Sequence, residues 1–200
     1  MSPGWRSVLR REVAAARRLV VLGVGTPENG DDAAGVFCAE EIRRGLRGRR
    51  FRRARVLVSA DVPESATGPI RRFRPTLVLI VDAALSKKRP GSVFFVARKD
   101  LAEESLTTHA IPLRFLMDYI EGTIGGRVLL LGIQPKAVAR GVPLSAPVRS
   151  AARVVAAEIL AGLRESPAGP PVRSSSASGH RDISSPPRNR AGGGRRCCRP

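Results

Sequence analysis

Short apolar runs alternate with segments of helical spacing from residue 19 to residue 163. Runs of branched aliphatic residues predict strands at 19–22, 56–58, 76–81, 93–96 and 128–133. Apolar residues at helical spacing predict helices over 112–121 and 146–163, and acids at the start with arginines at the end predict a helix over 31–45. The strand at 19–22 is continuously apolar, which is typical of a strand covered on both faces, and the run 76–81 is the strongest strand signal in the sequence. The pattern therefore predicts an α/β fold, a three-layer αβα sandwich around a mostly parallel, twisted sheet of about five strands.

The composition changes towards both ends of the chain. Beyond residue 165 the chain is rich in proline, glycine and serine, and Val172 and Ile183 are its only branched aliphatic residues. Such a segment buries too little apolar surface to offset the entropy lost on ordering. We therefore expect a basic N-terminal extension over 1–17, one domain over 18–165 and a disordered basic tail over 166–200.

The net charge of +18 is carried entirely by residues 1–18, 43–55 and 166–200, so the rest of the chain is neutral. Residues 43–55 hold eight arginines and a single aromatic residue, Phe51. Such a stretch can bind phosphates but lacks the aromatic side chains on which bases stack. Nucleic acid is therefore not the expected partner, although a basic module that binds nucleic acid or an acidic protein is the alternative interpretation.

Cysteine spacing and hydropathy indicate the compartment. The three cysteines are Cys38, inside a helical pattern, and the adjacent Cys197 and Cys198, so they form no framework of spaced pairs. No apolar run approaches the roughly 18 residues that a membrane span requires. We expect a cytoplasmic monomer that does not enter a membrane.

Several common catalytic motifs are excluded. The pair Gly23 and Gly25 follows a predicted strand, but the third glycine of a dinucleotide-binding loop would fall at Glu28. The carboxylates at positions 28, 31 and 32 would also repel a pyrophosphate. No serine lies in a G-x-S-x-G elbow, and Cys38 has the spacing of a core residue.

Polar residues follow the predicted strands, at the sheet edge where sites in parallel sheets gather. One acid of the pair Asp31 and Asp32 is expected to cap the following helix, which leaves the other for a ligand. Asp82 ends a strongly apolar strand, as either a structural turn residue or a catalytic or metal-binding one. Together, Asp32, Asp82 and His109 offer two carboxylates and an imidazole, a set that suits a borderline divalent ion such as nickel or zinc. No Cys-x-x-Cys or H-E-x-x-H motif accompanies them, so we expect no tightly bound resident metal.

Four stretches in this order resemble the hydrogenase maturation endopeptidases, over about residues 18–164. The last two are closest to the branch that serves formate-hydrogenlyase and related energy-converting hydrogenases. The four stretches are Val21-Leu22-Gly23-Val24-Gly25 with Gly30-Asp31-Asp32, Leu79-Ile80-Val81-Asp82-Ala83, Thr107-Thr108-His109 with Pro112-Leu113, and Leu131-Gly132-Ile133-Gln134-Pro135.

The resemblance implies an enzyme that removes the C-terminal extension from the large-subunit precursor of a nickel–iron hydrogenase after nickel insertion. It implies that Asp32, Asp82 and His109 are both the metal ligands and the catalytic residues. The nickel would be the precursor's own, so the enzyme would need no cofactor of its own. The reaction would hydrolyse one peptide bond without a covalent acyl-enzyme.

The chain departs from the family pattern at three places. Thr26 stands where the family usually has asparagine, and Ala33 stands where it has glycine. Val58-Ser59-Ala60 replaces a common Asp-Gly-Gly, although Pro63-Glu64 then matches. Because of these departures, a degenerate, inactive maturation factor is a further alternative, although all three expected ligands are retained.

Overall fold

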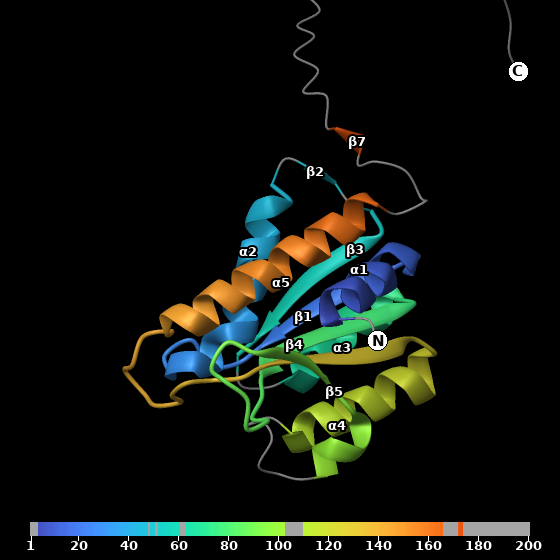
Figure 1. The fold of residues 1–200 in the computed structure, drawn as a ribbon. Coiled ribbons are helices and arrows are strands. Elements are labelled where there is room, and N and C mark those ends of the chain that lie inside the picture. Colours follow the sequence, from blue (N-terminus) through green and yellow to red (C-terminus); the bar gives the residue numbers. More distant parts are fainter. Residues whose placement is uncertain are drawn as a thin grey trace, which may run out of the picture.

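A five-stranded sheet forms the centre of the molecule (Figure 1). The computed structural model describes residues 4–47, 49–50, 52–60, 63–102, 110–165 and 172–173. The strand order is β3-β1-β4-β6-β5; the first four are parallel, and β5 runs antiparallel to β6 at the edge. The strands are β1 Leu19–Val24, β3 Ala54–Ser59, β4 Leu77–Ala83, β5 Val93–Val96 and β6 Arg127–Ile133. The predicted fold class is confirmed.

Helices cover both faces of this sheet, which completes the three layers. One face packs against α1, α2 and α5, and the other packs against α3 and α4. Every residue of β1 and β4 is buried, which explains why these two strands are apolar except at Asp82. The helices are α1 Trp5–Ala15, α2 Ala34–Gly45, α3 Thr67–Phe73, α4 Ala110–Tyr119 and α5 Ala146–Arg164. Shorter turns are η1 Gly30–Ala33, η2 Pro63–Ala66, η3 Arg98–Ala102 and η4 Ile120–Ile124.

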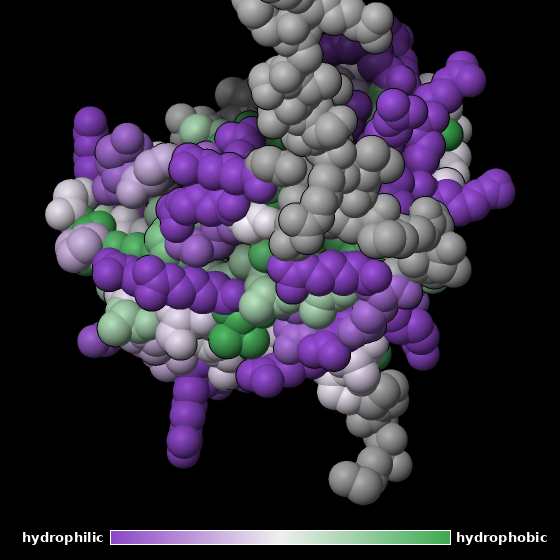
Figure 2. All heavy atoms as spheres, turned by 90° about the horizontal axis from the view of Figure 1, so that it is seen from above, coloured by the Kyte–Doolittle hydropathy of each residue, from purple (hydrophilic) through white to green (hydrophobic). Residues whose placement is uncertain are grey.

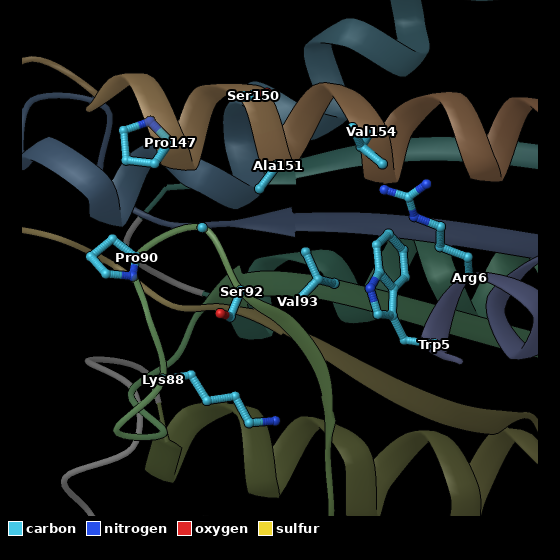
Figure 3. A pocket seen from close by; sticks show the side chains of 11 residues that line it. Trp5, Arg6, Lys88, Pro90, Ser92, Val93, Pro147, Ser150, Ala151 and Val154 are labelled. Carbon is cyan, nitrogen blue, oxygen red and sulfur yellow. The ribbon is translucent and has the colours of Figure 1, made fainter. Parts of the chain in front are cut away.

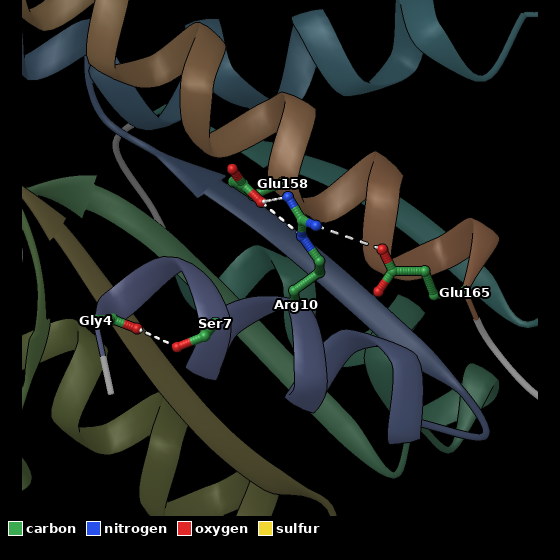
Figure 4. Close-up of polar contacts among 5 residues, drawn as sticks. All are labelled: Gly4, Ser7, Arg10, Glu158 and Glu165. Carbon is green, nitrogen blue, oxygen red and sulfur yellow. Dashed lines mark hydrogen bonds and ion pairs between the residues drawn. The ribbon is translucent and has the colours of Figure 1, made fainter. Parts of the chain in front are cut away.

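Helix α1 lies in the segment for which we expected an extension outside the domain. Its Leu9 and Val13 are fully buried in the core cluster that α5 also lines. Arg10 also donates a 2.8 Å hydrogen bond to the buried carboxylate of Glu158 and pairs with Glu165 (Figure 4). Helix α1 is therefore part of the folded domain. The sequence did not indicate this, because α1 has only two buried positions, four residues apart, and three arginines.

A second, two-stranded sheet joins β2, Arg49–Arg50, to β7, Val172–Arg173, in antiparallel pairing. Strand β7 falls inside the segment 166–200 for which we expected disorder, so at these two residues the prediction is corrected. Main-chain hydrogen bonds hold such a pair, and hydropathy does not indicate them. The other residues of that segment lie outside the described part of the chain.

Candidate functional site

The two acidic motifs converge at the carboxyl end of the sheet. Asp82 is the sixth residue of β4 and is fully buried. Asp31 and Asp32 lie in η1, which follows β1, the strand beside β4. They are 0% and 1% exposed, and η1 packs against β4. Acids from two motifs that are far apart in the sequence are thus buried together at the carboxyl end of the sheet, as expected for parallel strands.

Glycines allow this close approach of η1 and α2 to the sheet. A Cβ on Gly25, whose φ is +134°, would lie 1.8 Å from the carbonyl oxygen of Asp32. A Cβ on Gly35 would lie 2.0 Å from the carbonyl oxygen of Val81. Both contacts are far shorter than a carbon–oxygen contact allows. The glycines after β1 therefore serve backbone packing, in agreement with the absence of a dinucleotide-binding loop.

Asp31 holds the loop after β6 against η1. Its carboxylate accepts hydrogen bonds from the main-chain N–H groups of Lys136, Ala137 and Ser145, at 2.7, 3.1 and 2.7 Å. The Ser145 hydroxyl donates a further bond of 2.9 Å. Burial raises the pKa of Asp31, but these hydrogen bonds outweigh it, so the pKa lies below its ordinary value. The bonds lead to another segment and not to the start of α2, so the expected helix cap is replaced by a loop anchor.

Asp32 and Asp82 are each oriented by the main chain. The N–H of Thr26 donates a 2.8 Å hydrogen bond to Oδ2 of Asp32, and the N–H of Ala83 donates one of 2.8 Å to Oδ1 of Asp82. The contact from Thr26 uses the backbone, so the departure from asparagine at position 26 leaves it intact. Carboxylate oxygens held in this way suit a divalent ion.

The third predicted ligand, His109, lies outside the described residues, as do Thr107 and Thr108. Within the described ranges, no group of three or more histidine, cysteine, aspartate or glutamate side chains could hold a metal ion. Two carboxylates alone are a weak ligand set for nickel. A metal site at the carboxyl end of the sheet therefore depends on His109, and the proposed ligand set remains a prediction.

Gln134 has a role that the sequence did not reveal. Its side-chain oxygen accepts hydrogen bonds from the N–H and the hydroxyl of Ser86, at 2.7 and 3.2 Å. Its main-chain oxygen accepts a 2.8 Å bond from the N–H of Gly91. The loop that follows Asp82 is thus fastened to the end of β6. A polar residue directly after an apolar strand was the available signal.

Cys38 is a core residue, as its spacing predicts. It is fully buried, and this burial raises the pKa of its thiol. A thiol with these properties is not a nucleophile at neutral pH.

Four arginines of the stretch 43–55 make contacts within the protein, although three of these four are exposed. Arg43 and Arg44 pair with glutamates one helical turn earlier, and Arg55 lies over the ring of Phe73. Arg53 donates to main-chain oxygens at the C-terminal ends of α1 and α5. Figure 2 shows hydrophilic side chains spread over the face seen from above, with small hydrophobic areas between them. These contacts do not favour the nucleic-acid interpretation.

No helix among the described residues is both long and apolar enough to cross a membrane.

Comparison with known proteins identifies the family. The model of the hydrogenase maturation protease family matches residues 55–162, a range that includes Asp82. The hydrogenase 3 maturation protease of Escherichia coli K12 is 36% identical over 68% of this chain and 85% of its own length.

Solved structures agree with this assignment. The crystal structure of the [NiFe] hydrogenase maturation protease HycI from Thermococcus kodakarensis has a TM-score of 0.71 and 29% identity, over 78% of this chain and 99% of that one. The solution structure of the endopeptidase HycI from Escherichia coli has a TM-score of 0.64 and 34% identity, over 74% and 92% of the two chains. The chain belongs to the hydrogenase maturation protease family.

Proposed function

We propose that this protease hydrolyses one peptide bond near the nickel centre of a hydrogenase large-subunit precursor, and so removes the C-terminal extension. In this proposal Asp32, Asp82 and His109 coordinate the precursor's own nickel. The proposal rests on one observation. Asp32 of η1 and Asp82 of β4 are both buried at the carboxyl end of the sheet, where η1 packs against β4.

The nickel belongs to the substrate, and the enzyme supplies donors that complete its coordination. Two carboxylates and one imidazole leave positions on the ion for the precursor's ligands. Cleavage then depends on the presence of the metal, so only a precursor that has received nickel is processed. The enzyme itself carries no tightly bound cofactor.

The hydrolysis uses water and not a side-chain nucleophile. Water adds to the carbonyl carbon, the C–N bond breaks, and the departing amine takes up a proton. A carboxylate at the site accepts the proton from the attacking water. Two features argue against a cysteine or serine nucleophile: burial raises the pKa of the Cys38 thiol, and the sequence has no G-x-S-x-G elbow.

The proposal places a monomeric enzyme in the cytoplasm. The lack of spaced cysteine pairs supports a reducing compartment. Analytical ultracentrifugation of the purified chain tests the oligomeric state.

The test is incubation of the full chain with nickel-loaded and nickel-free precursor, followed by mass spectrometry of the products. We expect a C-terminal peptide from the nickel-loaded precursor only. His109→Ala should abolish its release, whereas Asp118→Asn, which alters an exposed surface ion pair with Arg98, should not. Equal cleavage of both precursors would reject the nickel requirement, and unchanged cleavage by His109→Ala would reject the ligand set.

A further inference from the structure

We infer that an extended segment of the precursor, several residues from the scissile bond, binds in the groove between α1, α5 and β5. It does so by adding a strand to the outer edge of β5. The inference rests on the proposed function, because the precursor is the occupant. The groove has a volume of about 490 Å³. Figure 3 shows Trp5 and Arg6 of α1 at one end, Pro90 and Pro147 at the other, and Val93 of β5 between them.

Among the described residues, no strand pairs with the outer edge of β5. Strand β5 ends the sheet and pairs only with β6 among the described strands. The main-chain N–H of Gln134 donates a 2.8 Å hydrogen bond to the carbonyl oxygen of Ser92, so this carbonyl points towards β6, whereas the N–H of Ser92 donates to Arg89. By alternation along β5, the main-chain groups of Val93 and Phe95 point away from β6. No described backbone group bonds to them, and an extended peptide can pair with such an edge.

The sequence of β5 lacks the residues that commonly protect an edge strand against pairing with another chain. Exposed edge strands are commonly protected by proline, by charged side chains or by a bulge. Strand β5 reads Val93-Phe94-Phe95-Val96, with neither proline nor charge. An apolar, unprotected edge beside a groove is therefore a surface suited to a partner strand.

The register of the sheet gives the distance between the outer edge of β5 and Asp82. Asp82 and Phe94 both pair with Gly132, so the three residues lie in one row across β4, β6 and β5. Strands are about 4.8 Å apart, so a segment added outside β5 lies roughly 14 Å from Asp82. At about 3.3 Å per extended residue, four or five residues span that distance. The docked segment therefore lies about that many residues from the scissile bond.

The groove walls indicate which side chains the segment carries. Trp5, Val93 and Val154 offer aromatic and aliphatic surface. Arg6 and Lys88 add two cations, each stacked on an aromatic ring and neither within 4 Å of a described carboxylate. Apolar and acidic side chains fit these walls, whereas a segment rich in lysine and arginine would be repelled.

Binding of a fluorescently labelled, full-length precursor to the full chain tests the inference directly. Ser150→Trp fills the groove from the exposed side of α5, and Val93→Pro removes the main-chain donor on the outer edge of β5. Each should weaken binding about fivefold or more, the effect of losing one or two good contacts. Ala157→Trp is the matched control, because Ala157 is exposed on the same helix and does not line the groove. Circular dichroism establishes that each variant is folded.

The outcomes separate this inference from the proposed function. If Ser150→Trp and Ala157→Trp bind the precursor as tightly as the original chain, the groove is not the docking site, whether or not cleavage occurs. If binding depends on the groove but no peptide is released, the docking site stands and the proteolytic proposal fails. If the precursor neither binds nor is cleaved, both are wrong.

Discussion

Replacement of Asp31 by asparagine tests the distinction between the two adjacent acids. The carboxylate of Asp31 accepts four hydrogen bonds from the loop after β6. Asparagine keeps one oxygen and places an NH₂ group opposite at least one of these donors. A hydrogen bond to a charged group contributes about 1.5–3 kcal/mol, so we expect Asp31→Asn to lower the free energy of unfolding by about 2–3 kcal/mol.

Chemical denaturation at neutral pH measures this loss, and a domain of this size should melt roughly 4–12 °C lower. The pKa of Asp31 is lowered in the folded protein, so its charge stabilises the fold above the unfolded pKa of about 3.9. That contribution disappears as the pH falls through the folded pKa. The difference between the two proteins should therefore shrink below about pH 4. A variant within about 0.5 kcal/mol of the original at neutral pH would refute the anchoring role.

Three further substitutions test how the domain is held together. Gly35→Ala should lower the free energy of unfolding by several kcal/mol or prevent folding, because the added Cβ would lie 2.0 Å from a carbonyl oxygen of β4; a normal melting temperature would contradict this. Arg53→Met should cost about 2–4 kcal/mol in urea denaturation, because it removes three hydrogen bonds at the ends of α1 and α5, and a loss below 1 kcal/mol would argue against that role. Leu9→Ala should lower the free energy of unfolding by about 2–5 kcal/mol if α1 packs in the core, and an unchanged stability would show that α1 is an extension outside the domain.

The architecture was predictable because its strands are simple to read. Strands β1 and β4 are buried on both faces and consist almost entirely of Val, Leu and Ile. The predicted strand ranges agree with the observed ones to within one or two residues. Helix α1 was not assigned to the domain, since its contribution rests on two buried side chains and on pairing with a helix about 150 residues away. Tertiary contacts of this kind leave little trace in local periodicity.

The candidate site was predictable only in part. The rule that polar residues gather at strand ends correctly brought together Asp82 and the pair Asp31 and Asp32. We also predicted correctly that one acid of the pair has a structural role, but as a cap of the following helix. The bond from Ser145 to Asp31 could not be predicted, because the two residues are more than a hundred positions apart. The tether made by Gln134 was missed for the same reason.

The rate of precursor cleavage by Asp32→Asn and Asp82→Asn is the most direct test of the account. Both variants keep the size of the side chain and should retain the fold, while release of the C-terminal peptide from nickel-loaded precursor should fall by at least about a hundredfold, as expected for loss of a metal ligand or catalytic group. Asp31→Asn is the matched control, with lower stability but cleavage retained at a temperature where it is folded. If folded Asp32→Asn or Asp82→Asn released the peptide at the original rate, the two buried carboxylates would not form the active site.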